Sequence, residues 1–156
     1  MHRAAGVGPV TAANLLSQFA RPELLFSNLD KVQNVSSAVQ QSLRQADWAA
    51  VEQDLVWLSE PNRHIVTLHD ERYPELLKQI ADPPTLLYVQ GDVSLLAQWQ
   101  IALVGSRNPS ASGADTAYEF SRYLAQGGIT ISSGLALGID AAAHKGALAA
   151  GGKTIA

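Results

Sequence analysis

A loop of small and polar residues follows a short apolar run near residue 100, and it carries residue types that bind phosphate. Its centre reads Gly105-Ser106-Arg107-Asn108. A glycine lets backbone approach a ligand, a serine offers a hydroxyl, and an arginine offers a planar fork of N–H donors. We therefore predict that Gly105, Ser106 and Arg107 bind a phosphate group, with Asn108 as a secondary contact. The alternative is a structural turn with one exposed arginine.

A second loop, residues 133–140, follows the next apolar run and reads Ser-Gly-Leu-Ala-Leu-Gly-Ile-Asp. Neighbouring parallel strands end at the same sheet edge, so this loop is expected to widen the same site. We predict that Gly134 and Gly138 shape the site and that Ser133 is a secondary contact. Asp140 is interpreted as the N-cap or first-turn acid of the helix that it opens, in preference to a ligand-binding acid.

The helix predicted after the second loop has unusually small side chains, which predicts close packing on the sheet. Gly146 lies inside it, where glycine costs about 1 kcal/mol relative to alanine. His144 could act as a base, as a phosphate donor or as a structural histidine at the edge of the core. Because no serine or cysteine nucleophile pattern surrounds it, the structural role is favoured. Lys145 is expected to be solvated and is a secondary candidate for phosphate contact.

Several motif-based functions are disfavoured. The first loop lacks the G-x-G-x-x-G spacing of dinucleotide-binding proteins, which disfavours an NAD-dependent enzyme. Residues 147–154 fit a relaxed nucleotide P-loop pattern, but they end a helix and open a strand, whereas a phosphate-binding P-loop follows a strand. With no cysteine and four scattered histidines, no metal site is expected. No catalytic residue and no cofactor are predicted.

The two loops need a parallel sheet to position them, and the apolar pattern predicts one. Expected strands cover residues 101–104, 129–133 and 154–156, and expected helices cover residues 114–126 and 139–150. In the first helix, Ala117, Phe120 and Leu124 are expected to be buried, and Ser112 with Asp115 to form a capping box. The resulting fold class is α/β, a Rossmann-like doubly wound parallel sheet. Because such a sheet would be unfinished at Thr154, the natural protein is expected to be longer, with this sheet C-terminally truncated.

The residues before this sheet predict a small all-helical domain of SAM-like or helix-hairpin-helix type. Helical spacing runs through residues 9–58, and strand patterns follow at 64–68 and 85–89, separated by a helical turn from Pro74. We predict a helical domain at 1–62 and the N-terminal part of a Rossmann-like domain at 63–156. Gly6-Val7-Gly8 resembles a helix-hairpin-helix turn, which either contacts DNA phosphate or serves packing and protein contact.

Composition indicates a globular chain. The 156 residues are 47% hydrophobic with a formal net charge of −3, and no apolar run reaches membrane-spanning length. The absence of cysteine agrees with a cytoplasmic location. Residues 1–92 carry seven basic and eleven acidic side chains, whereas residues 93–156 carry four basic and three acidic ones. A nucleic-acid partner contacting the second part is therefore compatible with the overall charge.

The order of these motifs resembles the DprA/Smf family. The resemblance is carried by the first loop, by the second loop with Asp140, by Ala143-His144-x-Gly146-Ala147-Leu148 and by Gly151-Gly152-x-Thr154. Upstream elements extend it over nearly the whole chain; these are Tyr73-Pro74-x-Leu76-Leu77, Asp82-Pro83-Pro84-x-Leu86, Tyr88-x-x-Gly91 and the Gly6-Val7-Gly8 opening.

The resemblance implies a protein that binds and protects single-stranded DNA and helps to load the RecA recombinase during natural transformation. It implies no covalent catalysis, no membrane and a homodimer in the full-length protein. By the same resemblance, Gly105, Ser106 and Arg107 would hold a DNA phosphate, and Gly134 and Gly138 would shape the adjacent pocket. Two alternatives stay open. One is a nucleotide-binding Rossmann-like carrier or nucleoside-monophosphate hydrolase, and the other is a protein-interaction role for the helical part.

Overall fold

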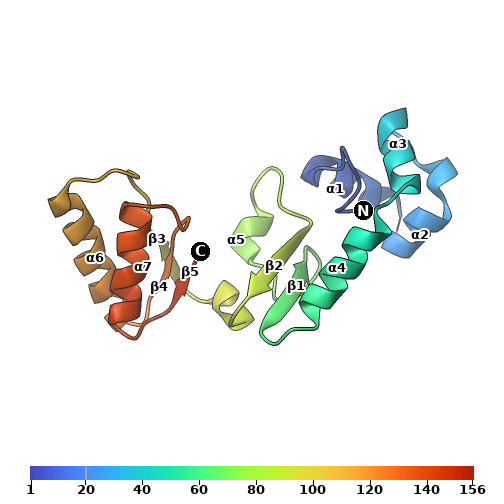
Figure 1. Ribbon diagram of the computed structural model, residues 1–156. Coiled ribbons are helices and arrows are strands. Elements are labelled where there is room, and N and C mark those ends of the chain that lie inside the picture. Colours follow the sequence, from blue (N-terminus) through green and yellow to red (C-terminus); the bar gives the residue numbers. More distant parts are fainter. Residues whose placement is uncertain (20) are drawn as a thin grey trace. The chain divides into compact units, whose positions relative to one another are not determined.

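The structure is a computed structural model that describes residues 1–19 and 21–156. The chain folds into two compact units, Met1–Val93 and Ser94–Ala156. N-terminal helices precede a small parallel sheet with helices, as expected for a mixed α/β chain (Figure 1). None of the helices in the described residues has the length and apolarity needed to cross a membrane.

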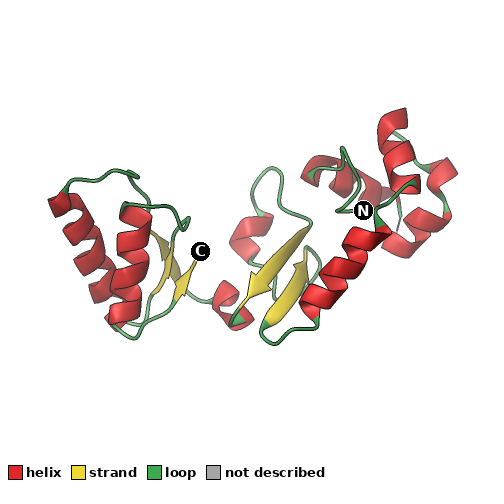
Figure 2. Cartoon of the chain, in the orientation of Figure 1, coloured by secondary structure: helices red, strands yellow, loops and turns green. Residues whose placement is uncertain are grey.

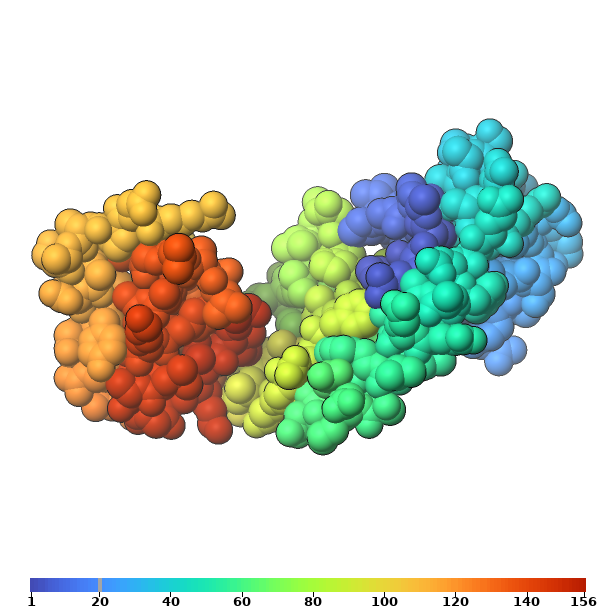
Figure 3. All heavy atoms as spheres, in the orientation of Figure 1, coloured from blue at the N-terminus to red at the C-terminus, as the bar shows by residue number. Residues whose placement is uncertain are grey.

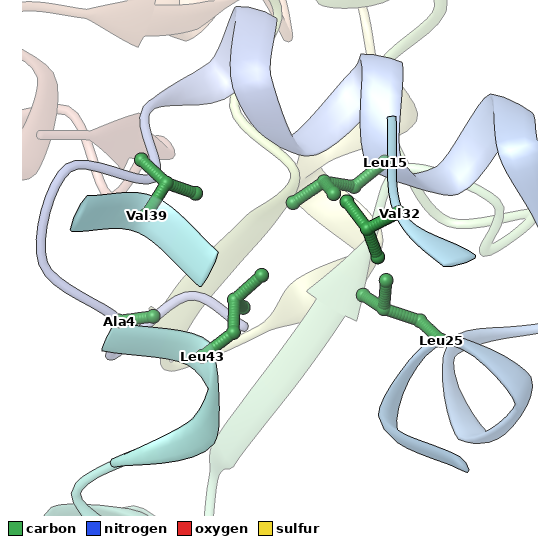
Figure 4. Close-up of a cluster of buried hydrophobic side chains, with 6 residues drawn as sticks. All are labelled: Ala4, Leu15, Leu25, Val32, Val39 and Leu43. Carbon is green, nitrogen blue, oxygen red and sulfur yellow. The ribbon is translucent and has the colours of Figure 1, made fainter. Parts of the chain in front are cut away.

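The first unit begins with a helical bundle. Its helices are α1 (Pro9–Gln18), α2 (Pro22–Ser27), a 3₁₀ turn (Leu29–Lys31), α3 (Ser37–Arg44) and α4 (Trp48–Leu58). Six side chains from α1, α2, α3 and the adjoining segments converge in its core, namely Ala4, Leu15, Leu25, Val32, Val39 and Leu43 (Figure 4). Leu15 and Leu25 are fully buried. The Gly6-Val7-Gly8 turn packs onto this core, because a Cβ on Gly6 would lie 3.3 Å from Cγ2 of Val39.

A two-stranded antiparallel sheet completes the first unit. Strands β1 (Arg63–Thr67) and β2 (Leu86–Gln90) pair in the register Ile65↔Tyr88, and α5 (Glu75–Lys78) lies between them in sequence. Tyr73 is buried and its hydroxyl donates to the carbonyl of Pro84 at 2.8 Å. The residues from 63 onward were predicted to belong to the second domain, and that boundary stays a prediction; by compactness, this hairpin groups with the helices.

The N-terminus is tied to α4 by an ion pair. Both Nε and the Nη2 atom of Arg3 donate to the carboxylate of Asp54. Hydrogen bonds from Arg3, reinforced by the Tyr88 hydroxyl, lower the pKa of Asp54 to about 2. Trp57 on α4 meets the ring of Tyr88 edge-on at 5.4 Å, which adds an apolar contact between α4 and β2.

The second unit is built from two β–α–β steps. It contains β3 (Gln100–Ala102), α6 (Ala111–Gln126), β4 (Thr130–Ser132), α7 (Ile139–Ala149) and β5 (Thr154–Ile155), preceded by a 3₁₀ turn (Val93–Ala97) at the junction with the first unit. The strands are parallel in the order β3-β4-β5, with Ala102 opposite Ser132 and Ser132 opposite Ile155. Both helices contact β4 and each other, so they cover the same face of the sheet (Figure 2).

Both helices of this unit end in the same way. In α6 the N–H of Gly128 donates to Ala125 and that of Ile129 to Leu124; in α7 the N–H of Gly151 donates to Leu148 and that of Gly152 to Ala147. These paired bonds are Schellman motifs, and the left-handed residue in each is a glycine, with φ of +84° at Gly128 and +68° at Gly151. The chain therefore leaves each helix in a direction that leads directly into the next strand.

Among the small residues of α7, Gly146 serves the contact with α6, so the prediction of close packing on the sheet is wrong for this residue. Ala143 and Ala147 cluster with Ile131 of the sheet and with Ala125 of α6. A Cβ on Gly146 would lie 2.1 Å from the carbonyl oxygen of Tyr118 and 2.2 Å from Oγ of Ser121. The buried Ser121 hydroxyl donates to the carbonyl of Ala143 at 2.7 Å. The space-filling view shows the two helices in contact (Figure 3).

Two local predictions about α6 are corrected. Phe120 is 52% exposed, and the buried positions of α6 are Ala117, Ser121 and Ala125. The N-cap of α6 is Ser110, whose hydroxyl accepts from Gly113 N, so Ser112 already lies inside the helix and no capping box forms there.

The continuous apolar run at residues 101–104 is typical of a buried parallel strand, but all three residues of β3 are exposed. Within the described chain it pairs with β4 alone, and this leaves its other edge without a partner strand.

Candidate functional site

The two predicted loops meet at the carboxyl edge of the sheet. The first leaves β3 and runs to the start of α6; the second leaves β4 and runs to the start of α7. The hydroxyl of Ser133 donates to the carbonyl of Leu103 at 2.6 Å, and the backbone N–H of Ile139 donates to the carbonyl of Ser106 at 3.1 Å. The first turn of α7 is thus bonded directly to the centre of the first loop.

Two glycines make this close approach feasible. A Cβ on Gly105 would lie 2.6 Å from Cγ1 of Ile139, and a Cβ on Gly138 would lie 2.3 Å from the carbonyl oxygen of Ser106. Gly138 also has φ of +85° and ψ of −126°, a backbone conformation that only glycine adopts readily. Packing between the loops therefore requires both glycines, and the prediction that they admit a ligand stays a prediction.

The first loop presents a set of free donors. Gly105, Ser106 and Arg107 are all exposed, and within the described part of the chain their backbone N–H groups donate no hydrogen bond. The Ser106 hydroxyl accepts from Asn108 N at 3.0 Å, which folds the loop into a tight turn. No described acid pairs with Arg107. A guanidinium without an internal partner, beside free amides, can bind an anion.

The second loop is held from inside by Asp140. Its Oδ2 atom accepts from Gly134 N at 3.2 Å and from Ala136 N at 3.4 Å. The predicted N-cap role is wrong, because Gly138 occupies the N-cap position and Asp140 lies two residues further on, in the first turn of α7. The predicted first-turn position is confirmed.

Two of the secondary candidates, Ser133 and Lys145, are not among the free donors of the first loop. The Ser133 hydroxyl is engaged with Leu103, and Ser133 itself is 7% exposed. Lys145 is solvent-exposed, as predicted, but it follows Ile139 by six residues, about 9 Å along the helix axis. Asn108 lies within the first loop and is exposed.

His144 joins α7 to β5. It is 7% exposed, and its Nδ1 atom lies 2.6 Å from Oγ1 of Thr154, which donates to the carbonyl of Ile131 at 2.8 Å. Both contacts are satisfied when Nδ1 carries the proton. This arrangement supports the structural interpretation, with Thr154 rather than backbone as partner. Nε2 is buried and has no hydrogen-bond partner among the described residues.

The structure bears on one other prediction. Residues 147–154 run from the end of α7 into β5, which confirms that the P-loop-like pattern lies in the wrong context. Across residues 1–19 and 21–156, histidine, aspartate and glutamate side chains form no cluster able to hold a metal ion.

Sequence reasoning missed the part played by Ile139. Its side chain packs on Gly105 and its N–H bonds Ser106, so it connects the two loops. No sequence signal identifies this role. An isoleucine at a helix start is an ordinary core residue, and the hydrogen-bond partner of its backbone N–H cannot be predicted from the residue type.

The fold and the loops define an α/β protein in which N-terminal helices precede a small parallel sheet, with an exposed donor set at the carboxyl edge of that sheet. Comparison with known families identifies the kind of protein. The family described as DNA recombination-mediator protein A matches residues 64–156, which is more than half of the chain. The chain belongs to this DprA/Smf family.

Individual relatives agree with this assignment. The protein Smf of Escherichia coli is 43% identical over 107 residues, covering 69% of this chain and 29% of that protein. The DNA processing protein DprA of Streptococcus pneumoniae is 46% identical over 87 residues, covering 56% of this chain and 30% of that protein. The X-ray structure of DprA from Streptococcus pneumoniae matches with a TM-score of 0.77 and 31% identity, over 97% of this chain and 53% of that one. The chain thus spans about 30% of the length of these curated relatives.

Proposed function

We propose that the first loop binds a phosphate of single-stranded DNA and that the protein acts as a non-enzymatic recombination mediator. In this role it binds and protects single-stranded DNA and helps to load the RecA recombinase during DNA uptake. Its partners are single-stranded DNA, RecA and a second copy in the full-length protein, and it uses no cofactor. The sheet of the second unit is proposed to be the front portion of a doubly wound Rossmann-like sheet, and residues 1–62 a SAM-like helical domain.

One observation carries the DNA-binding proposal. Arg107 stands exposed and without an ion-pair partner in the described chain, next to the three free N–H groups of the first loop. Backbone amides and a guanidinium recognise a phosphate without reading the base, which agrees with sequence-tolerant binding. Family membership in the DNA recombination-mediator proteins supports the choice of DNA over a free nucleotide.

The proposal is tested by fluorescence anisotropy of a labelled poly-dT oligonucleotide with the full-length protein and its Arg107→Ala variant. Loss of one phosphate contact is expected to weaken binding by about 1 to 2 kcal/mol, roughly 5- to 30-fold. The slope of log K against log salt is expected to become shallower by about 0.7, the value for one single-strand phosphate. Arg107→Lys keeps the charge but loses the fork, so it should weaken binding while leaving the salt slope unchanged.

Lys153→Ala is the matched control. Lys153 is also exposed and has no ion-pair partner in the described chain, but it immediately precedes β5 and therefore lies at the opposite edge of the sheet. Its removal changes the net charge by the same amount and should leave affinity and salt slope nearly unchanged. Equal effects of the two variants would argue for a diffuse electrostatic field instead of a local site. A folded wild type that does not bind the oligonucleotide would refute the proposal and favour the nucleotide-binding alternative.

A further inference from the structure

The carboxylate of Asp140, in the first turn of α7, accepts hydrogen bonds from the loop that precedes this helix. Asp140 is 7% exposed, and a single oxygen, Oδ2, accepts from the N–H groups of Gly134 and Ala136. Between these two residues, Leu135 adopts φ of +57°, in the left-handed region that a leucine rarely enters. The backbone is therefore held in an uncommon conformation at this turn.

This geometry is that of an anion-binding turn. When a residue in the left-handed conformation separates two N–H donors, the donors converge on one point and form a concave site for an anion. The chain fills that site with its own carboxylate. The first turn of α7 adds the positive end of a helix dipole, which further favours a negative charge there. The N–H groups of Gly134 and Ala136 in the second loop are therefore already bonded within the chain, whereas the N–H groups of the first loop are free.

The loop held by Asp140 contacts the first loop in two ways, by close packing and by a hydrogen bond. It ends at Gly138, which fits against the carbonyl oxygen of Ser106 so tightly that a Cβ would lie 2.3 Å away. The next residue, Ile139, donates its N–H to that same carbonyl at 3.1 Å. A displacement of residues 134–138 would therefore move Ser106 and, with it, the adjoining backbone of Arg107.

We propose that Asp140 is a positioning residue: as an internal hydrogen-bond acceptor it fixes the second loop, and through Gly138 and Ile139 it fixes the first loop in the conformation that binds DNA phosphate. This inference rests on the proposed function and assigns to Asp140 no contact with the DNA. Its carboxylate acts as a hydrogen-bond acceptor, so an uncharged acceptor of the same size can replace it.

The test measures poly-dT affinity of the full-length protein for Asp140→Ala, Asp140→Asn, Arg107→Ala and the Arg107→Ala/Asp140→Ala double variant. Asp140→Ala is expected to weaken binding about tenfold, within the range observed for coupled sites. Asp140→Asn keeps an oxygen able to accept from both amides and should bind within about twofold of wild type. In the Arg107→Ala background, removal of Asp140 should cost less than about twofold, because its effect passes through the first loop.

Far-UV circular dichroism checks that each variant is folded. If Asp140→Ala unfolds, Asp140→Ser replaces it, since the shorter hydroxyl keeps a polar group in the first turn of α7 but cannot reach both amides. Amide shifts of Gly134 and Ala136 in a ¹H–¹⁵N spectrum should change in the alanine or serine variant and be retained in the asparagine variant.

The outcomes separate this inference from the proposed function. If wild type binds, Arg107→Ala weakens binding and Asp140→Ala does not, the DNA site stands and the inference fails. The inference also fails if Asp140→Asn binds as weakly as Asp140→Ala, because charge would then be the active property. An equal effect of Asp140→Ala with and without Arg107 would likewise overturn it. Absence of binding by wild type would remove the proposed function and this inference together.

Discussion

Substitution of Gly146 by alanine has two opposed effects on the free energy of unfolding, a gain from helix propensity and a loss from overpacking. In an ordinary helix interior this change is stabilising by about 1 kcal/mol, because alanine has the higher helix propensity. Here the added Cβ would lie 2.1 Å from the carbonyl oxygen of Tyr118, and backbone atoms cannot rotate away. Overpacking of this kind costs about 1 to 3 kcal/mol. Separation of the helices would also disturb the buried hydrogen bond from Ser121 to Ala143, which is worth about 1 kcal/mol.

The net expectation for Gly146→Ala is a loss of about 2 kcal/mol in the free energy of unfolding. Urea unfolding followed by far-UV circular dichroism measures it. The pair Lys145→Ala and Lys145→Gly is the control, since Lys145 is the adjacent, exposed position of the same helix and reports propensity alone. There, alanine should be the more stable variant by about 1 kcal/mol. A Gly146→Ala protein that is as stable as wild type, or more so, would refute the close approach of α6 and α7.

Three further substitutions test other features by the same unfolding measurement. Ser110→Ala removes the N-cap of α6 and should cost about 1 kcal/mol, whereas Ser112→Ala should cost far less; equal losses would contradict the assigned cap. Gly138→Ala should cost at least about 2 kcal/mol, because its backbone conformation is almost closed to alanine and the Cβ would strike Ser106; a neutral result would argue against the contact between the loops. Asp54→Asn tests the ion pair with Arg3. Since folding lowers the pKa of Asp54 from 3.8 to about 2, its stabilising contribution is present above pH 3.8 and is lost as the pH falls toward 2. At neutral pH the free energy of unfolding of the wild type should exceed that of the variant by at most about 1 kcal/mol, because the pair is partly exposed, and most of this difference should be lost by pH 2. A difference that persists unchanged at pH 2 would show that the effect is not the ion pair.

The order of helices and strands was predictable because it depends on local patterns. Apolar runs and glycine breaks predicted the strands and helices of the second unit to within three residues at each boundary. For α7, the glycine pair at 151–152 also predicted where the helix stops, since Gly151 can adopt the left-handed conformation that a Schellman motif requires.

What could not be predicted depends on contacts between distant parts of the chain. The spacing of small residues in α7 indicated close packing, but not that the partner of Gly146 is α6 instead of the sheet. Phe120 fits the apolar stripe of α6 by position, yet it is exposed, because Ser121 faces α7 in its place. The positions of the two loops followed from the order of elements, whereas the direction of the Asp140 carboxylate followed from the backbone conformation of Leu135.

The exposed edge of β3 has a practical consequence for work with this chain in solution. Ile101 is 37% exposed, Val104 76% and Trp99 90%, alongside backbone groups that lack a partner strand in the described residues. Unpaired apolar edges of a sheet can template aggregation. For the 156-residue chain by itself, turbidity at high protein concentration should therefore originate at this edge, and Ile101→Lys should improve solubility without disturbing either loop.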